Sequence, residues 1–301
     1  MNVQSKPQRY EIANRYLFKG HLEMQTALHI GGGKFTLSHS NSPIVLTSDQ
    51  EPFIPGSSFK GALRSSIEKL IPSLRVDSRL RSCGLMKRDM LIEAGNRAGA
   101  ECPTARVEEI GKKIRQQPGN AEQIRKEERE KLCHTCQLFG SPFAAARMTV
   151  HDLFLVENEW GGAIEIRDGV AIDRDSENAK DGGKYDFEVV PASTAFRLTI
   201  ALENATLEDR QILSLGLNDF MNGFGAIGGK RSRGLGACII RELSVYSLEL
   251  DEKDEQKRRQ QWQNYLLKRD ETRYTQEIPG QKFVDDHINE IFPRDSVEEQ
   301  V

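Results

Sequence analysis

The sequence lacks any apolar run of the length that a membrane-spanning helix needs. Its N-terminus, with Arg9, Glu11 and Arg15, lacks the apolar core of a secretion signal. Its five cysteines are an odd number, which argues against a disulfide framework and for a reducing compartment. These absences predict a cytoplasmic protein that is not membrane-bound. Its 301 residues, 38% hydrophobic and 29% charged, are enough for one large globular domain or two small ones.

A strong excess of positive charge is also missing, because the formal net charge is −3. Residues 249–301 carry 9 basic and 14 acidic side chains, a net of −5, so the remainder carries 33 basic and 31 acidic side chains, a net of +2. The average charge therefore provides no attraction to nucleic acid. Any binding of nucleic acid has to come from local clusters of cations.

One such cluster lies at the start of a predicted helix. Pro55-Gly56 predicts a turn, and Ser57 or Ser58 is a good N-cap for the helix that follows. The apolar residues of this helix recur at helical spacing and predict an inward face: Phe59, Leu63, Ile67 and Leu70. Lys60 and Arg64 lie one turn apart, near the end where backbone N–H groups favour anions. The pattern fits a phosphate-binding helix start, and it also fits an ordinary capped helix with two solvated cations.

A second cluster lies in the loop of residues 223–236, where six of fourteen residues are glycine. Glycines allow backbone N–H groups to approach an anion closely. Lys230, Arg231 and Arg233 add three cations between Gly229 and Gly234. The spacing is not that of a P-loop, which argues against a nucleotide hydrolase. We predict that this loop binds RNA phosphates; a flexible turn is the alternative.

Four cysteines border or lie within a polar segment, residues 78–132, which we interpret as an insertion of short helices, the last over residues 121–131. Cys133 and Cys136 form a C-x-x-C pair, which places two thiolates within reach of one tetrahedral ion. Cys83 and Cys102 would complete a zinc site, with His134 as a reserve ligand. A structural Zn²⁺ suits an insertion with little core of its own. The alternative is a reduced C-x-x-C pair with unrelated thiols elsewhere.

The remaining pattern predicts a sheet. Apolar and polar residues alternate from Tyr16 to Ile30, which predicts a long half-buried strand followed by a long loop and a short strand at residues 51–54. A second helix begins in capping-box style at Thr206, with a core face of Ile212, Leu213, Leu217 and Phe220. Further strands are predicted at residues 148–160, 196–202 and 237–246. This order is compatible with an α+β, ferredoxin-like (RRM-type) core that carries large insertions.

A resemblance makes these predictions more specific. The run Ile54-Pro55-Gly56-Ser57-Ser58-Phe59-Lys60-Gly61-Ala62-Leu63-Arg64 resembles the signature of the RAMP superfamily, the RNA-binding proteins of CRISPR systems. More narrowly, it resembles the subunit that polymerises along the guide RNA in type III effector complexes. Three other stretches agree in order, namely Leu28–Gly33, Cys133–Gly140 and Gly228–Gly236. Together the four stretches cover roughly residues 16–245.

The resemblance implies a function and a set of partners. The chain would be a backbone subunit that binds guide (crRNA) phosphates, presents the guide to single-stranded target RNA and contributes to antiviral defence. It would assemble with copies or paralogues of itself and with other CRISPR effector subunits. The RNA contacts carried over from the motifs are Gly56, Ser57, Ser58, Lys60, Arg64, Gly229, Lys230, Arg231, Arg233 and Gly234.

The resemblance also bears on catalysis. Relatives that cut target RNA resemble one another in an Asp-x-Pro-Val/Ile run ahead of the helix motif, and the matching run here is Asn41-Ser42-Pro43-Ile44. An amide cannot accept a proton or hold a divalent cation as a carboxylate does. We therefore predict weak or absent cleavage, and no catalytic residue. Two alternatives stay open: a repeat-RNA processing endoribonuclease using His29 or His39, and an enzyme that binds a phosphorylated metabolite at residues 56–64.

The predicted organisation follows from these motifs. Residues 1–77 form the first half of an RRM-like palm, residues 78–136 the cysteine-bracketed insertion, and residues 137–163 continue the palm. Residues 164–188 form a β-hairpin thumb with a polar tip at residues 173–183, as in the relatives. Residues 189–248 complete the palm, and residues 249–301 form a charged helix, over residues 251–269, and a loose acidic tail.

Overall fold

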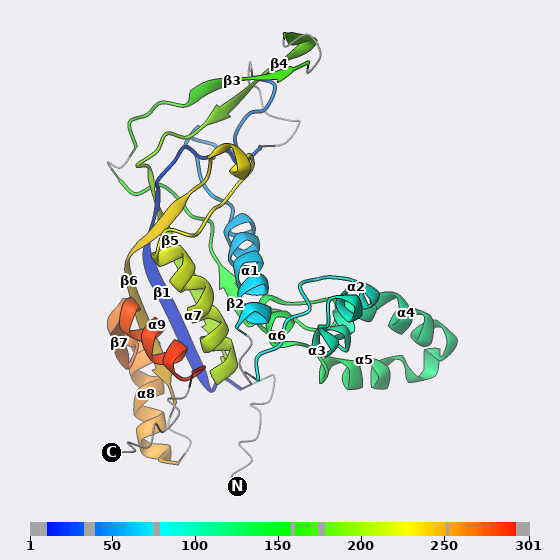
Figure 1. The fold of residues 1–301 in the computed structure, drawn as a ribbon. Helices are drawn as coiled ribbons and strands as arrows, with labels where there is room; N and C mark the ends of the chain where they lie inside the picture. The colour runs from blue at the N-terminus through cyan, green and yellow to red at the C-terminus, as the bar shows by residue number, and fades with distance from the viewer. Residues whose placement is uncertain are drawn as a thin grey trace, which may run out of the picture.

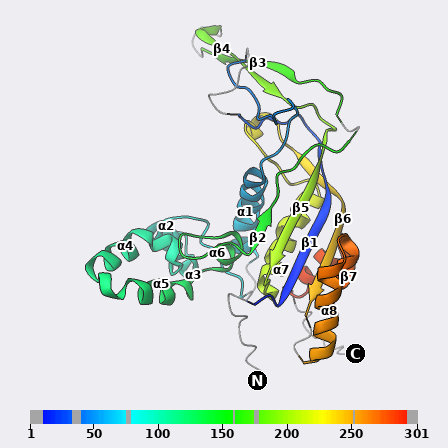
Figure 2. The same cartoon turned by 180° about the vertical axis from the view of Figure 1, so that it is seen from behind.

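The computed structural model describes residues 11–32, 40–74, 79–157, 160–173, 178–250 and 253–292. Its centre is an antiparallel sheet with α1 (Gly56–Ser73), α7 (Leu207–Met221) and α9 (Gly280–Asn289) on one face (Figure 1) and α8 (Glu255–Leu267) against the other face (Figure 2). The strand order is β2 (Met148–Val150), β5 (Ala195–Glu203), β1 (Asn14–Met24), β6 (Cys238–Glu249) and β7 (Gln276–Pro279). The sheet and its helices are called the palm below. No described helix is both long and apolar enough to cross a bilayer.

Strand β1 lies at the middle of the sheet, between β5 and β6. The predicted alternation is confirmed, because Tyr16, Phe18 and Leu22 are buried while the residues between them are not fully buried. The strand ends earlier than predicted, at Met24, and Leu28 makes only an isolated bridge to Val190. The chain stops pairing with β5 and β6 after Met24, because the backbone of the following residues bonds to segments at the thumb end of the sheet, as Leu28 does to Val190.

Helices α1 (Gly56–Ser73) and α7 (Leu207–Met221) pack on one face of the sheet. The predicted core residues of both helices are confirmed as buried, except Leu70, which is partly buried. Thr206 and Asp209 form the predicted capping box. The two helices approach closely at Gly216, where an added Cβ would lie 2.7 Å from the side chains of Leu63 and Ile67.

Ser57 and Ser58 were predicted as N-caps of α1, and this is wrong. The N-cap is Pro55, and Gly56 is the first helical residue. The backbone N–H of Gly56 donates to Oδ1 of Asp152 at 2.7 Å, so a carboxylate from a distant segment satisfies the helix end.

The insertion is helical, as predicted, and projects beside the C-terminal half of α1 (Figure 1). Its elements are α2 (Arg88–Glu93), α3 (Arg97–Ala100), η1 (Pro103–Arg106), α4 (Val107–Gln116), η2 (Pro118–Asn120), α5 (Ala121–Arg129) and α6 (His134–Phe139). Strand β2 is shorter than the predicted strand of residues 148–160. Beyond it, Leu153 bridges Ile54 and Leu155 bridges Phe196, so the segment changes partners and no single ladder continues.

The thumb is the two-stranded sheet of β3 (Glu165–Ile172) and β4 (Ala179–Val189), at the end of the palm away from the insertion (Figure 1). The predicted hairpin is therefore present. Its tip is shorter than predicted, because residues 179–183 already belong to β4. The ring of Tyr185 lies over Gly169, where an added Cβ would be 2.3 Å from the ring.

The C-terminal segment folds onto the palm, so the predicted loose tail is wrong for residues 270–292. After α8 (Glu255–Leu267) and the turn η4 (Glu271–Arg273), β7 pairs with β6 and extends the sheet beyond the predicted last strand. Helix α9 (Gly280–Asn289) packs beside α7 and buries Phe283 and Val284 in the main core. Acidic side chains such as Asp285 and Asp286 lie on its exposed face, which is why composition alone predicted a solvated tail.

Candidate nucleic-acid interface and cysteine centre

Four segments meet at the thumb end of the palm: the start of α1, residues 40–54, the glycine-rich loop of residues 223–236, and the base of the thumb (Figure 1). We call this region the loop end. Backbone bonds join the glycine-rich loop to the segment after β1, where Gly229 N donates to His29 O at 2.8 Å, and the thumb base to residues 40–54, where Glu188 N donates to Ser42 O at 3.1 Å. The start of α1 and the glycine-rich loop therefore lie toward the same end of the palm.

The helix start at the loop end is tightly packed around Gly56. An added Cβ there would lie 2.4 Å from Val150 O, so a side chain has no room. Because Asp152 already accepts from the Gly56 amide, this amide faces a carboxylate of the chain itself. Ser57 is exposed and Ser58 is partly exposed. The groups at this helix start that can meet an anion are therefore the residues that follow Gly56.

Lys60 and Arg64, predicted to act together, point to different partners. Lys60 Nζ donates to Met148 O at 2.9 Å, and partial burial lowers the pKa of this amine. Arg64 reaches the insertion, where its Nη1 donates to Gly140 O at 3.2 Å and its Nη2 lies 3.4 Å from Cys136 Sγ. Its Nε donates to Glu68 at 2.7 Å, and the side chain is 14% exposed. Burial opposes the charge of Arg64, but the bond to Glu68 raises its pKa.

The cations of the glycine-rich loop lie against the thumb. Lys230 Nζ is 4.4 Å from the ring centroid of Phe187, and the guanidinium carbon of Arg233 is 5.8 Å from that of Tyr185. Arg233 also donates to the Tyr185 hydroxyl. Arg231 is exposed. Sequence reasoning missed both aromatic residues; the alternation Tyr185-Asp186-Phe187 indicated that they share a face, but not that the loop lies on it.

Glycine is required at two points of this loop. Gly228 has φ 85°, and an added Cβ would be 2.5 Å from His29 O. Gly236 has φ 82°, and an added Cβ would be 1.9 Å from Ile227 O. Gly228 therefore lets the loop lie against the segment after β1, and Gly236 lets the loop close on its own residue Ile227. Lys230 itself has φ 58° in the left-handed region, and the short turn η3 (Arg231–Arg233) follows it.

The histidines offered for the nuclease alternative gain no support. His29 is 8% exposed, its Nδ1 lies 2.7 Å from Glu188 O, and its ring packs edge-on against Phe187. These contacts describe a packed core histidine. His39 lies outside the described residues.

Asn41 lies beside the thumb. Its backbone N–H donates to Asp186 Oδ1 at 2.6 Å, and it lines a cavity of about 330 Å³. The other residues of this cavity belong to the thumb: Asp168, Val170, Lys184, Tyr185 and Asp186. Asn41, which the resemblance predicted to stand in place of an aspartate, contributes an amide to this cavity.

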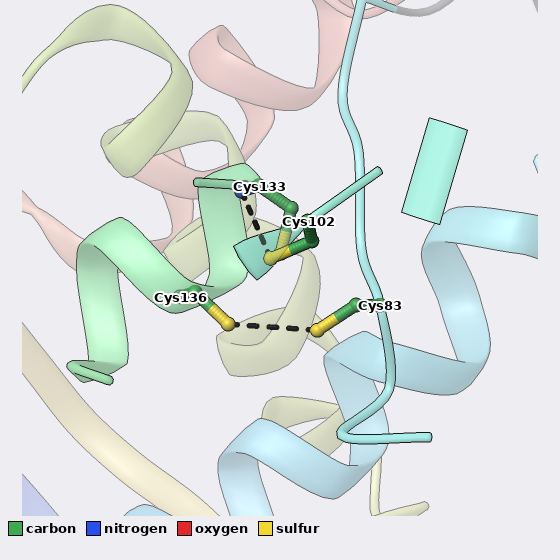
Figure 3. A group of neighbouring side chains, drawn as sticks. All are labelled: Cys83, Cys102, Cys133 and Cys136. Carbon is green, nitrogen blue, oxygen red and sulfur yellow. Dashed lines mark hydrogen bonds between the residues drawn. The ribbon is translucent and has the colours of Figure 1, made fainter. Parts of the chain in front are cut away.

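The four cysteines predicted to share one ion come together, as Figure 3 shows. The sulfur atoms of Cys83, Cys102, Cys133 and Cys136 all lie within 4.8 Å of one another, and all four residues are buried. Four thiolates at Zn–S distances of about 2.3 Å place the sulfurs about 3.8 Å apart, so this donor set fits a tetrahedral zinc ion. His134 is not needed as a ligand: its Nδ1 accepts from Arg81 N at 2.9 Å.

Hydrogen bonds favour thiolate character in part of this cluster. Hydrogen bonds with the other cysteines, above all with Cys133, lower the pKa of Cys102. The hydrogen bond with Cys102 is the main cause that raises the pKa of Cys83. The bond with Cys102 raises the pKa of Cys133, but those with Cys136 and Cys83 lower it, to about 7 overall. Thr104 Oγ1 donates to Cys136 Sγ at 3.2 Å, and Cys133 N donates to Cys102 Sγ at 3.4 Å. The hydrogen bond with Cys102 raises the pKa of Cys136, as it does that of Cys83, so binding a metal would release protons from these two thiols.

Comparison with known proteins places these motifs in one family. A family model described as the RAMP superfamily matches residues 21–239, from β1 to the beginning of β6. The match includes the start of α1, the cysteine cluster, the thumb and the glycine-rich loop. A protein of Methanocaldococcus jannaschii named "CRISPR system Cms endoribonuclease Csm3" is 22% identical over 249 residues, which cover 78% of this chain and 82% of that protein. The chain belongs to the RAMP superfamily, as the motifs predicted.

Proposed function

We propose that the chain is a backbone subunit of a type III CRISPR effector complex and that its loop end binds the phosphates of the guide RNA. The observation that carries this proposal is the packing of the cations of the glycine-rich loop on two thumb aromatics, at the end of the palm where α1 begins. Cations bind the backbone of a single strand, and aromatic rings stack on its bases. The similarity to Csm3 supports the same assignment.

The arrangement of the palm supports an RNA-binding role. The order of strands β2, β5, β1 and β6, with α1 and α7 on one face, supports the proposal of a β-α-β-β-α-β ferredoxin-like core. RRM domains use that fold to bind RNA. The strand β7 and helix α9 are additions at the edge of this core.

The proposed RNA contacts are phosphate contacts. In the helix start they are Ser57, Ser58 and Lys60, with Gly56 setting the turn, and in the loop they are Gly229, Lys230, Arg231, Arg233 and Gly234. A guanidinium carries five N–H donors, so the bond from Arg233 to Tyr185 leaves donors for a phosphate. Such contacts fix the position of the strand without reading its sequence. RNA binding by Arg64 stays a prediction, since its recorded contacts lie within the protein.

Cys83, Cys102, Cys133 and Cys136 would hold a structural Zn²⁺. The ion would supply no chemistry to RNA; it would join the segments before α2 and η1 to α6 and so stabilise the insertion. The proposed partners are guide RNA, single-stranded target RNA, copies or paralogues of this chain and other effector subunits, and the proposed role is antiviral defence.

Cleavage of target RNA is not part of the proposal, although the name of the relative describes an endoribonuclease. A side-chain amide at Asn41 neither accepts a proton from a 2′-hydroxyl nor binds Mg²⁺ as a carboxylate does. The loop end would hold RNA and orient it, while Asn41 would leave the strand intact.

The proposal is tested by expressing the chain with its operon partners and extracting the bound RNA. We expect a small RNA in the purified complex, and a loss of about tenfold or more when Lys230, Arg231 and Arg233 are changed together to Gln. The control changes Lys257, Arg258 and Arg259 of α8 to Gln, which removes the same charge away from the loop end. A complex without RNA, or equal RNA in both variants, would contradict the proposal.

A further inference from the structure

Arg64 belongs to the helix motif that the sequence assigned to RNA, yet its side chain ends at the cysteine centre. Its Nη2 lies 3.4 Å from Cys136 Sγ, and its Nη1 donates to Gly140 O, immediately beyond α6. The guanidinium carbon lies 5.7 Å from the ring centroid of Phe139, also in α6. Glu68, one turn further along α1, accepts a hydrogen bond from Arg64 Nε and so fixes the orientation of the guanidinium group. Three groups of the α6 segment thus surround one arginine of α1.

The chemistry of a four-thiolate site explains this placement. Four thiolates around one Zn²⁺ carry a net charge of about −2, and a buried charge is costly without a compensating partner. The four cysteines are buried, so solvent compensates little of this charge. Charge-assisted N–H donors to the ligand atoms are the usual remedy, and they also hold the ligands in place. Cys136 Sγ has one such donor, Arg64 Nη2, beside a neutral hydroxyl donor, Thr104 Oγ1.

We propose that Arg64 is a positioning residue of the metal centre: it donates to the Cys136 thiolate, offsets the charge of the metal–thiolate group and ties helix α1 to the insertion. This inference rests on the zinc site included in the proposed function, and it is independent of RNA binding. It gives the last residue of the Ile54–Arg64 motif a role different from that of Lys60, one turn earlier. Lys60 contacts β2, whereas Arg64 contacts α6.

The placement also links the insertion to the loop end. Arg64 lies two turns after Gly56 on the same helix, so a contact that fixes Arg64 restrains the helix whose first turn lies at the loop end. The cysteine centre therefore supports α1 as well as the insertion.

The experiment measures metal retention in the purified full chain. Zinc-loaded protein is mixed with the chromogenic chelator 4-(2-pyridylazo)resorcinol, and the release rate is followed by absorbance. We expect Arg64→Gln to release zinc about ten to a hundred times faster, as outer-shell changes do. Arg64→Lys keeps the charge but loses the planar guanidinium group, so its zinc-release rate should fall between those of the wild type and Arg64→Gln. Lys69→Gln, an exposed cation of the same helix, serves as the matched control with the wild-type rate.

A second readout separates a metal role from general loosening of the fold. The chain is loaded with Co²⁺, and the thiolate-to-cobalt charge-transfer band is recorded for each variant. Loss of a donor to Cys136 changes the electron density on sulfur, so Arg64→Gln shifts the band and Lys69→Gln does not. An unshifted band with a wild-type release rate in Arg64→Gln would overturn the inference. So would a wild-type chain that binds neither metal.

The outcomes remain distinguishable from those of the RNA proposal. A chain that holds zinc through Arg64 but carries no RNA would leave this inference standing and remove the proposed function. If Arg64→Gln does not fold, Arg64→Lys supplies the same comparison, because it retains a cation at this position. A release rate for Arg64→Lys equal to that of wild type would then contradict a role for the guanidinium fork.

Discussion

The chain contains two helix starts with the same sequence pattern and the same backbone. Residues 54–59 and 278–283 both read Ile-Pro-Gly-x-x-Phe. The N-cap prolines have φ and ψ of −55° and 132° at Pro55, and of −54° and 134° at Pro279. In each case glycine is the first helical residue, and the phenylalanine three residues later is buried, 0% exposed at Phe59 and 2% at Phe283. The pattern is a corner that turns the chain from an extended segment into a helix against the sheet.

The surroundings of the two corners differ. Helix α1 begins at the loop end, beside the thumb and the glycine-rich loop, whereas α9 begins at β7, on the outer edge of the sheet (Figure 1). The corner at Gly56 lies inside the region matched to the RAMP superfamily, and the corner at Gly280 lies outside it. The isoleucine, proline, glycine and phenylalanine are therefore explained by folding. Any RNA binding depends on where the corner lies and on the residues added to it, Ser57, Ser58 and Lys60.

The largest expected effect tests the shared part of the comparison. Phe59→Ala and Phe283→Ala should each lower the free energy of unfolding by about 3–5 kcal/mol, because each removes a buried ring from the core. Urea denaturation followed by circular dichroism measures the change. Phe224→Ala is the control, since this ring is 82% exposed and its loss should cost no more than about 0.5 kcal/mol. A cost below about 1 kcal/mol for Phe283→Ala would mean that α9 is not part of the core.

A smaller effect tests the two glycines. Gly56→Ala and Gly280→Ala should each cost about 1–3 kcal/mol, because the added methyl group meets Val150 O at 2.4 Å in one corner and Leu243 O at 2.5 Å in the other. Gly61→Ala supplies the contrast, since nothing lies within 4 Å of its added Cβ, and it should stabilise α1 by about 0.4–1 kcal/mol. Equal stability of Gly56→Ala and Gly61→Ala would show that the corner tolerates a side chain.

Much of the palm could be predicted because its signals are local. The alternation of β1, the capping box at Thr206 and the C-x-x-C pair each depend on residues close in sequence. The convergence of Cys83 and Cys102 on that pair followed from the chemistry of a four-thiolate site.

The contacts that were missed are long-range. Arg64 and Lys60 share a helix face by spacing, but only the folded insertion places Cys136 within reach of Arg64. Tyr185 and Phe187 meet the glycine-rich loop through a packing of two segments more than forty residues apart. Helix α9 was missed although the sequence contains a pattern that predicts it. Ile278-Pro279-Gly280 repeats the helix start at Gly56, but it lies among acidic residues.

The central claim, that the cations of the loop end bind RNA phosphates, is tested most directly by the salt dependence of binding to single-stranded RNA. One variant changes Lys60, Lys230, Arg231 and Arg233 to Gln; the control changes Lys257, Arg258, Arg259 and Lys282, the last being a cation of the second corner. Binding is measured by fluorescence anisotropy over a series of salt concentrations. The slope of log K against log salt should be shallower by about 3 in the first variant, at about 0.7 for each phosphate contact, and unchanged in the control. Equal slopes in the two variants would contradict the claim.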